Sequence, residues 1–471
     1  MPIDVEPRLE SKPPIPRRPR RVRKPRAALL AAATAAVFCA SPALANGRFP
    51  RADQLVAAPG QSEQLVLRAT FGLLVSRDAG ATWDWICEKA IGFEGQEDPA
   101  VALLSGGRLL AGIAAGLSQT SDSFCAWQFA SLPVAGVELV DLTVRPLQPE
   151  SAVALAWQRT DAKGSNAFGY RALFFSTNDA GSSWQSYGTG IDPSVLVLTV
   201  DVAPSDPHRL YASGIRPAAR TAALFVSTDD GQTWVERAAP FDSPREQGLY
   251  IAAVDPLVPE RVYLRSSGAS SSRLLVTSDA GASFDVLFSG RSLLGFALAA
   301  EGSEIYVGGP EDGLWWASRD ARVFEQRSSL PVLCLLSLPN QLYACSNEQL
   351  GFALGVSADG GRQFSALLHL SEVRGPIGCA PETSAGACGE AWPTLAERLG
   401  VPPDRGTPEP GAPSGAGGAA MPAPVKPAGG DGGCSVGSAP KSTRSFLVHA
   451  FLFSIGMAFV FRRAPRTSPS P

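Results

Sequence analysis

Short apolar runs alternate with polar corners through the middle of the chain. Residues 198–213 read LTVDVAPSDPHRLYAS and residues 251–266 read IAAVDPLVPERVYLRS, so two apolar runs flank each corner. Runs this short, bounded by Pro, Asp and Gly, are typical of β-strands rather than helices. Similar strand pairs lie at 54–68, 101–113, 142–156, 296–308 and 332–346. The pattern therefore predicts seven strand pairs.

A recurring turn follows most of these strand pairs after a third apolar run. It reads Ser/Thr-x-Asp-x-Gly and ends, two residues later, in an aromatic residue. In such a turn the Asp side chain accepts bonds from nearby backbone N–H groups, and Gly supplies a positive φ. We therefore expect the Asp residues to fix the turns, with calcium binding as the alternative. The five intact copies are Ser76, Asp78, Gly80, Trp83; Thr177, Asp179, Gly181, Trp184; Ser227, Asp229, Gly231, Trp234; Thr277, Asp279, Gly281, Phe284; and Ser357, Asp359, Gly361, Phe364.

Two further copies of the turn are eroded, with Phe124 and Arg322 in the Gly position. Counting these two, the closing aromatic residues recur 40 to 57 residues apart. That spacing is about the length of one four-stranded propeller blade. We predict an all-β fold, a seven-bladed β-propeller of four-stranded blades over residues 46–372, with a tandem sandwich or a solenoid as the alternative. The first unit begins with an inner strand, which favours ring closure by whole blades, unless residues 47–53 supply an outer strand.

The turn resembles the Asp-box, also called the bacterial neuraminidase repeat. The whole unit is similar to the propellers of sialidase-like, sortilin-like and photosystem II assembly-factor proteins. The resemblance covers residues 46–372 and implies the fold. Function does not follow from it, because the same propeller carries glycosidases, receptors and assembly factors.

Both ends of the chain have the composition of targeting segments. Basic residues crowd positions 17–26, an apolar stretch follows, and Ala43-Leu44-Ala45 precedes Asn46. This order predicts a signal peptide over residues 1–45, cleaved between Ala45 and Asn46. Residues 401–433 are mostly Pro, Gly and Ala, which predicts a disordered linker.

The last segment, residues 434–471, carries an apolar run at 446–461 that ends in Arg462 and Arg463. We predict a hydrophobic helix there, although a membrane-spanning helix usually needs about 20 residues. Together with Gly433-Cys434-Ser435, the segment resembles the C-terminal sorting signal of myxobacteria. That resemblance implies cleavage and lipid modification at Cys434, with a permanent transmembrane helix as the alternative. Both readings tether an exported propeller to the cell surface or outer membrane of a Gram-negative cell.

Six cysteines lie between these targeting segments, an even number that predicts disulfides in an exported domain. We expect Cys334 to pair with Cys345 across one hairpin. We also expect Cys379 to pair with Cys388 inside a cap at 373–400 that contains a short helix, and Cys87 to pair with Cys125 on outer strands of adjacent blades. Metal binding is the weaker alternative, because no Cys-x-x-Cys occurs and no histidine lies nearby. We expect no metal and no cofactor.

The net charge of −3 conceals a segregation along the chain. Residues 1–45 carry +6 and residues 434–471 carry +5, which leaves −14 on residues 46–433. A domain of this sign repels phosphate backbones, so nucleic-acid binding is disfavoured.

Candidate catalytic residues are few. Residues 46–433 hold two histidines, His208 in a corner and His369 after the last strand, and we expect structural positions for both. A sialidase-like enzyme needs three arginines and a tyrosine nucleophile, and the sequence assigns none of them; Arg48-Phe49-Pro50 is the nearest text to that family's Phe-Arg-Ile-Pro. Asp141 and Asp201 could serve a two-carboxylate glycosidase, although their strand-corner positions favour a structural role.

We interpret the chain as a non-enzymatic, surface-tethered propeller that presents loops to a protein or a glycan. The alternatives are a sialidase-like or xyloglucanase-like glycoside hydrolase and an assembly factor for an envelope complex. The ligand is expected at the face formed by the corners 204–208 and 256–259, or at the face opposite them.

Overall fold

The computed structural model describes residues 49–403, apart from 121–122, 132, 134–135, 162–167, 189, 244 and 300. The predicted signal peptide with its cleavage site at Ala45, the C-terminal segment with Cys434, and all but the first three residues of the predicted linker lie outside the described residues.

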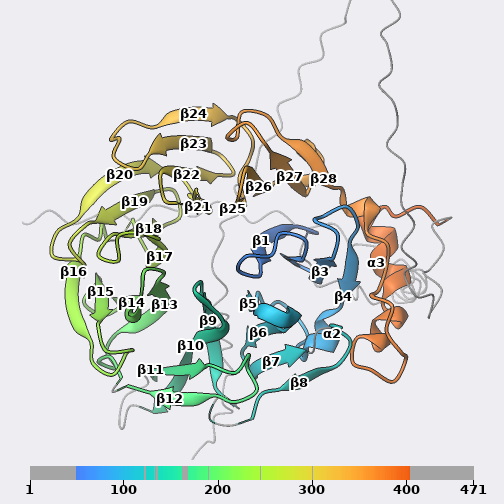
Figure 1. Cartoon of the computed structure of the whole chain (residues 1–471), viewed down its shortest axis with the longest axis horizontal. Coiled ribbons are helices and arrows are strands. Elements are labelled where there is room, and N and C mark those ends of the chain that lie inside the picture. Colours follow the sequence, from blue (N-terminus) through green and yellow to red (C-terminus); the bar gives the residue numbers. More distant parts are fainter. Residues whose placement is uncertain are drawn as a thin grey trace, which may run out of the picture. The chain divides into compact units, whose positions relative to one another are not determined.

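The described strands form seven four-stranded antiparallel sheets around a common axis (Figure 1). Each sheet, or blade, takes four consecutive strands in chain order, and the first strand lies nearest the axis. Blades 1 to 4 contain β1 (Ala52–Ala57), β2 (Leu65–Ala69), β3 (Gly72–Ser76), β4 (Asp84–Ile86); β5 (Ala100–Leu103), β6 (Leu109–Ile113), β7 (Gly116–Thr120), β8 (Trp127–Phe129); β9 (Glu138–Arg145), β10 (Gln148–Asp161), β11 (Phe168–Thr177), β12 (Gln185–Tyr187); and β13 (Leu196–Ala203), β14 (Asp206–Arg216), β15 (Thr221–Ser227), β16 (Val235–Ala239).

Blades 5 to 7 repeat the arrangement and complete the predicted seven-bladed propeller, which is confirmed. They contain β17 (Gly248–Val254), β18 (Val262–Ser267), β19 (Ser272–Thr277), β20 (Asp285–Gly290); β21 (Gly295–Leu298), β22 (Glu304–Gly309), β23 (Gly313–Ser318), β24 (Glu325–Ser328); and β25 (Cys334–Leu338), β26 (Gln341–Cys345), β27 (Leu354–Ser357), β28 (Ser365–Leu368). Short helices are α2 (Glu88–Ile91), α3 (Trp392–Leu399), η1 (Ser105–Gly107), η2 (Glu348–Leu350), η3 (Leu370–Glu372) and η4 (Gly386–Glu390).

The ring closes by whole blades. Each first strand contacts the first strands of both neighbouring blades, and β1 contacts β25 to close the circle. Because residues 52–57 form an inner strand, the alternative in which residues 47–53 supply an outer strand is wrong. Within residues 49–403, the structure contains no helix of the length and apolar character needed to cross a membrane.

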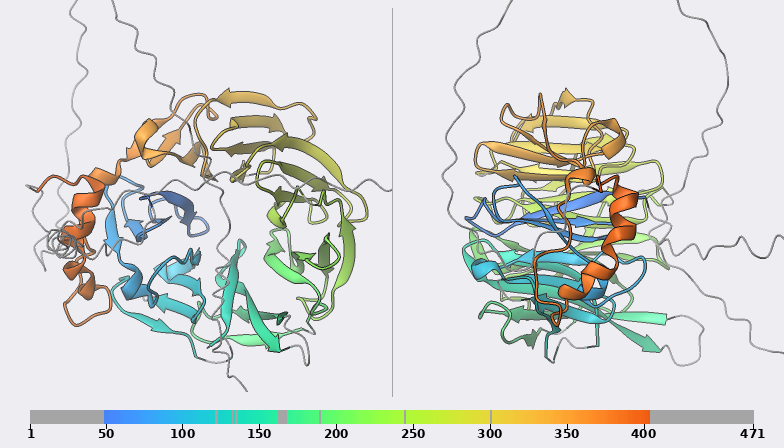
Figure 2. Two further views of the ribbon diagram at one scale, coloured as in Figure 1. Left: turned by 180° about the vertical axis from the view of Figure 1, so that it is seen from behind. Right: turned by 90° about the vertical axis from the view of Figure 1, so that its right-hand side faces the viewer.

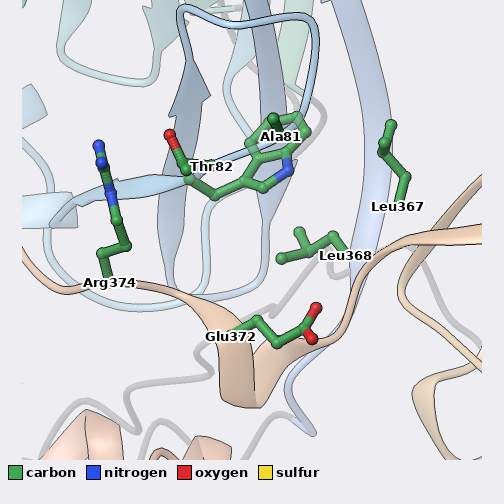
Figure 3. A pocket seen from close by; sticks show the side chains of 7 residues that line it. Ala81, Thr82, Leu367, Leu368, Glu372 and Arg374 are labelled. Carbon is green, nitrogen blue, oxygen red and sulfur yellow. The ribbon is translucent and has the colours of Figure 1, made fainter. Parts of the chain in front are cut away.

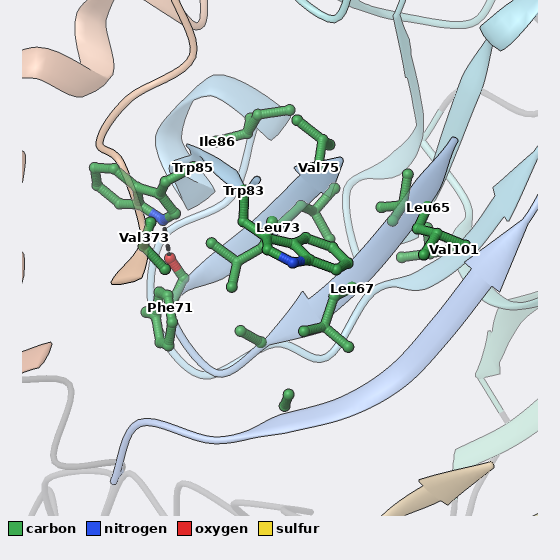
Figure 4. Packing of buried hydrophobic residues seen from close by; sticks show 14 of the residues in the cluster. Leu65, Leu67, Phe71, Leu73, Val75, Trp83, Trp85, Ile86, Val101 and Val373 are labelled. Carbon is green, nitrogen blue, oxygen red and sulfur yellow. Dashed lines mark hydrogen bonds between the residues drawn. The ribbon is translucent and has the colours of Figure 1, made fainter. Parts of the chain in front are cut away.

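Apolar side chains fill the spaces between blades. The largest cluster joins blade 1 to blades 2 and 7 and to the segment after the last blade. At its centre lies Trp83, the aromatic residue of the first Asp-box, which is 2% exposed (Figure 4). Nearby, the indole N–H of Trp85 donates to the Phe71 carbonyl at 2.7 Å. The closing aromatic of this turn therefore packs into the core of the ring.

A segment that we call the clasp, residues 374–399, follows the last blade and runs along the outer rims of blades 1 and 2 (Figure 2, orange). It lies parallel to β4, where Trp85 N–H donates to Gly375 at 2.7 Å and Ile377 N–H donates to Trp85 at 2.9 Å. The Arg374 guanidinium binds Asp84 through two bonds of 2.9 and 2.6 Å. The clasp therefore covers an outer strand edge that would otherwise have free backbone groups.

All six cysteines form disulfides, as predicted, and Cys334 pairs with Cys345. The other two pairs differ from the predicted ones: Cys87 pairs with Cys388, and Cys125 pairs with Cys379. Cys87 follows β4 and Cys125 precedes β8, so each lies on an outer rim that the clasp crosses. The predicted pairs Cys87–Cys125 and Cys379–Cys388 are wrong because the clasp lies against both rims.

Candidate functional site

The five intact Asp-box turns share one set of hydrogen bonds. In blade 4, the Ser227 hydroxyl donates to Asp229 at 2.7 Å and accepts the Gly231 N–H at 2.8 Å. The Asp229 carboxylate also accepts the N–H and the hydroxyl of Thr233 at 2.9 and 2.6 Å. The bonds that join the first hydroxyl, the Asp carboxylate and the Gly N–H recur around Asp78, Asp179, Asp279 and Asp359. At Asp359 the second hydroxyl is absent, because Gln363 stands at the position of Thr233. Each carboxylate is therefore engaged within its own turn.

The bond from the Thr233 hydroxyl is the main cause that lowers the pKa of Asp229 to about 2. Hydrogen bonds from Ser283 likewise lower the pKa of Asp279 to about 2. Two consecutive residues take a positive φ in each turn, for example Asp230 at 60° and Gly231 at 82°. In every intact turn but that of blade 7, where Gly360 comes first, a non-Gly residue thus shares the left-handed conformation that the sequence pattern assigns to Gly alone.

The two eroded turns are linked to other parts of the ring. In blade 2, Phe124 takes a φ of 60° in the Gly position, and the adjacent Cys125 forms a disulfide with the clasp. In blade 6, Arg319 pairs at 3.2 Å with Asp255 of blade 5, whose carboxylate is fully buried. A covalent bond therefore holds one eroded turn, and an ion pair holds the other.

His208 and His369 both form hydrogen bonds that fix local structure. The exposed His208 ring lies 2.6 Å from Asp230, and this hydrogen bond raises the pKa of His208. His369 begins η3 with a capping box to Glu372. Among the described residues, no three His, Cys, Asp or Glu side chains gather in a group that could hold a metal ion.

Side chains of blades 3 to 5 bond across the inner rim of the ring. The Asp141 carboxylate on β9 accepts the N–H of Leu142 and, from the next blade, the N–H of Val200, both at 2.9 Å. The Asp201 carboxylate on β13 accepts the Thr143 hydroxyl of the preceding blade at 2.9 Å. Asp141 and Asp201, which three intervening strands separate in the sequence, therefore lie on adjacent inner strands.

A third bond continues this series into blade 5, where Ile251 N–H donates to the Thr199 hydroxyl at 2.9 Å. The inner strands of these blades are each interrupted by a register shift, beside which these side chains bond. Inner-strand edges carry N–H groups that no further strand can pair. Side chains of one blade thus satisfy edge groups of the next; we call these contacts the inner stitches.

Burial shifts the titration of both carboxyl groups. It raises the pKa of Asp141 to about 7, and the negative charge of Asp201 contributes to that rise. Burial also raises the pKa of Asp201. Two carboxyl groups with raised pKa values on adjacent strands have the acid character that a glycosidase needs. Their oxygens, however, accept hydrogen bonds from the protein itself.

A different pair on the inner rim has unused donors. Tyr250 on β17 lies opposite Arg265 on β18, and the Arg265 guanidinium lies 5.8 Å from the centre of the Tyr250 ring. Arg265 donates one bond to the Leu293 carbonyl. Among the described residues Arg265 has no acidic partner, and burial lowers its pKa. Such a cation can bind an anion.

Sequence reasoning missed Tyr250 and Arg265. The text Val262-Tyr263-Leu264-Arg265 carried a signal, because Arg265 falls on the same strand face as the buried Tyr263. A cation at a buried position of a β-strand usually has a partner or a function.

Two cavities lie elsewhere on the ring. One, of about 280 Å³, lies where blade 7 meets blade 1 and is lined by Thr82, Trp83, Leu368, Glu372 and Arg374 (Figure 3). Its charged residues already have partners, since Arg374 binds Asp84 and Glu372 caps η3. The other, of about 320 Å³, is a groove between blades 6 and 7 that Ser328 and Ser329 line together with apolar side chains.

Comparison with known proteins yields no matching family model and no matching curated protein. Solved structures of similar shape include an ancestral GH74 enzyme, at 16% identity and a TM-score of 0.48 over 68% of this chain and 45% of that one. YCF48 bound to a D1 peptide matches at 15% identity and a TM-score of 0.42, over 63% and 91%. A Hadza microbial sialidase matches at 13% and 0.36, over 66% and 73%. The chain thus spans less than half of the GH74 enzyme, and likenesses of this strength identify no activity for it.

Proposed function

We propose that this chain is an exported propeller that binds a protein or a glycan without transforming it. The observation that carries the proposal is the contrast at the inner rim. The carboxyl groups suited to acid–base chemistry are held by the inner stitches, whereas Tyr250 and Arg265 have donors to spare. A group whose bonds are already made within the protein is poorly placed to transfer protons to a substrate.

Export is supported by the three disulfides, which are typical of proteins that fold outside a reducing cytosol. Two of them join the clasp to the ring. Surface tethering through Cys434 or through the apolar run at 446–461 is part of the proposal and is tested by localisation. Replacing Cys434 by Ser should leave the protein unlipidated or misplaced; unchanged surface display contradicts the lipid anchor.

A glycoside hydrolase is the second candidate, and one observation favours it. Asp141 and Asp201 lie on adjacent inner strands, and the pKa of Asp141 is raised to about 7, so that near pH 6 it is mostly protonated. A protonated carboxyl group beside a second carboxyl group is the arrangement that a glycosidase uses to protonate its leaving group.

Turnover separates the two candidates. The full chain, produced in an oxidising compartment, is incubated with fluorogenic sialosides and glucosides and with xyloglucan, and product release is followed from pH 4 to pH 8. We expect no release above the level of the Asp141→Asn and Asp201→Asn variants. Release by the native chain that both variants lose, at unchanged thermal stability, overturns the binding proposal in favour of the hydrolase.

A further inference from the structure

The clasp is attached to blade 1 near both of its ends and to blade 2 in between. At its start, Gly375 and Ile377 pair with Trp85 of β4 in blade 1. Toward its end, the Trp392 ring lies 5.7 Å from the ring of the same Trp85. Residues 378–386 lie between these two attachments, and we call them the clasp loop. The loop can leave blade 2 while both ends of the clasp stay on blade 1.

Hydrogen bonds and a disulfide hold the clasp loop on blade 2. The Ser384 hydroxyl donates to the Trp127 carbonyl and accepts the Trp127 N–H, both at 3.2 Å. The Ala385 N–H donates to the Cys125 carbonyl at 3.1 Å, and the disulfide Cys125–Cys379 is the covalent link. Since Trp127 begins β8, the outer strand of blade 2, the loop covers backbone groups at a strand edge.

The three disulfides differ in access to solvent. The two that do not hold the clasp loop are buried, since none of their four cysteines is more than 6% exposed. Cys125 and Cys379, by contrast, are half-buried, and the residues on both sides of Cys379 are exposed. Thiol–disulfide exchange requires that a thiolate reach a sulfur atom. Cys125–Cys379 is therefore the disulfide that a reductant in solvent reaches first.

A positive charge lies beside Cys125. The exposed Arg77 of blade 1 donates to the Ser123 carbonyl at 3.0 Å, and its guanidinium lies 5.2 Å from the centre of the aromatic ring that precedes Cys125. On the clasp side, the exposed Glu382 follows Cys379 by three residues. A nearby cation favours the thiolate form of a cysteine, and a nearby carboxylate disfavours it. Since exchange is faster when the leaving sulfur is the more stable thiolate, attack at Cys379 with departure of Cys125 is favoured.

We propose that Cys125–Cys379 is a thiol–disulfide exchange site that releases the clasp loop from blade 2. The co-reactant is a dithiol, of the kind that oxidoreductases acting outside the cytosol carry. One sulfur of the dithiol attacks Sγ of Cys379 as a thiolate. The bond between the two cysteines breaks, and its electron pair leaves with Sγ of Cys125, which takes up a proton.

A second exchange completes the reaction. The other sulfur of the dithiol attacks the first, the bond to Cys379 breaks, and Cys379 leaves as a thiolate and is protonated. Two electrons and two protons thus pass to the chain, and the co-reactant becomes a disulfide.

Release of the loop leaves the ring closed, because Cys87–Cys388 and the pair Arg374–Asp84 still hold the clasp on blade 1. The N–H and the carbonyl of Trp127 then lie at a free strand edge, with which an extended segment of another chain can pair. This inference goes beyond the proposed function, since the exchange needs no ligand on the ring.

The test places the oxidised full chain in dithiothreitol at about pH 8 without denaturant, a pH at which thiolates are available. Samples are alkylated with iodoacetamide at intervals and digested, and mass spectrometry follows each cysteine separately. We expect Cys125 and Cys379 to be alkylated about tenfold faster or more than the four cysteines of the buried disulfides. Opening of all three disulfides at one rate, or earlier opening of a buried one, overturns the assignment of the site.

Limited digestion with a glutamate-specific protease tests whether the loop is released, because Glu382 is the one glutamate within residues 378–386. A segment must detach from the fold before a protease can cut it, so we expect cleavage after Glu382 to follow the opening of Cys125–Cys379. The double variant Cys125→Ser, Cys379→Ser should be cut there without reductant. A site that resists cleavage in both the reduced native chain and this variant overturns the release.

Arg77→Gln tests the cation, with Arg291→Gln as its matched control, because Arg291 is also exposed but lies in the connection after blade 5. Arg77→Gln should slow the opening by about threefold, as expected for a poorer leaving thiolate. In the Cys379→Ser background it should also move the pH profile of Cys125 alkylation to higher pH. Arg291→Gln should change neither. An unchanged pH profile in Arg77→Gln overturns the role of Arg77 and, with it, the preference for Cys125 as the leaving sulfur.

Discussion

Blades 1 and 2 and blades 3 to 5 are joined to their neighbours at opposite rims of the ring. At the outer rim, the clasp crosses from the last blade to the first two and is fixed by two disulfides and by the pair Arg374–Asp84. At the inner rim, hydrogen bonds that Asp141 and Thr199 accept and that Thr143 donates join three regular blades. The clasp disulfides thus occur where the ring closes and beside the eroded turn of blade 2, whereas hydrogen bonds join blades 3 to 5, whose Asp-boxes are intact.

Because the links differ in chemistry, different solution conditions should weaken the two regions. A disulfide is insensitive to the protonation of carboxyl groups but is broken by reductant. The inner stitches resist reductant but include carboxyl groups whose pKa values are raised. Each region can therefore be weakened while the other stays intact.

The largest effect is expected from the clasp. Replacing Cys87 and Cys388 by Ala opens a disulfide that spans 301 residues. Because Cys125–Cys379 lies within that span and stays closed, the loop that opens holds about 50 residues. By the loop-entropy account its opening should lower the free energy of unfolding by about 4 kcal/mol. Urea denaturation under oxidising conditions measures it.

The hairpin disulfide Cys334–Cys345 is the matched control for that experiment, since it spans 11 residues. Its double Ala variant should lose less, about 3 kcal/mol, because the loop it closes is short. Equal losses in the two variants would show that loop closure does not explain the clasp, and no loss for Cys87 and Cys388 would show that the clasp does not hold the ring.

The sequence predicts these two regions to different extents, and the reason is physical. The Asp-box recurs because most blades use the same turn, so its spacing together with the seven strand pairs predicts seven blades, and the Asp bonds follow from the turn itself. The clasp occurs once. Nothing in residues 373–400 states which rim they lie against, and proximity in sequence favoured the wrong pairs for Cys379 and Cys388.

The inner rim was predictable in part. Asp141 and Asp201 stand out in the sequence as corner carboxylates, but their bonds cross from one blade to the next and depend on register shifts that no residue pattern marks. The lack of an acidic partner for Arg265 is harder still to predict, because a carboxylate could have come from any neighbouring blade. Only the assembled ring reveals that none does among the described residues.

An intermediate effect is expected from an intact Asp-box. Ser227 is 1% exposed, and its hydroxyl accepts the buried N–H of Gly231. Ser227→Ala leaves that N–H without a partner and should lower the free energy of unfolding by about 1–3 kcal/mol. Thermal and urea denaturation measure the change.

Ser318→Ala, at the position in the eroded turn of blade 6 that matches Ser227, provides the contrast to Ser227→Ala. Ser318 is exposed, and Arg319 beside it pairs with Asp255 of blade 5. A smaller loss there supports the view that the ion pair has replaced the Asp-box bonds in blade 6. A loss as large as that of Ser227→Ala contradicts it.

A further effect is a pH dependence of the inner stitches. The pKa of Asp141 is raised from 3.8 to about 7 in the folded chain, so between those values the folded state binds more protons than the unfolded state. Stability from this group is therefore greatest at low pH, falls as pH rises from about 4 to about 7, and is flat above. Asp141→Asn, which stays uncharged, should flatten this part of the profile of melting temperature against pH.

Asp229→Asn is the opposite control, because hydrogen bonds lower the pKa of Asp229 to about 2. Its carboxylate stabilises the fold above about pH 4 and ceases to do so as pH falls toward 2. Removing it should therefore change the profile on the acid side alone. If Asp141→Asn also changes only that side, the carboxyl group of Asp141 titrates normally, and the inner rim is then no more sensitive to pH than the covalent clasp.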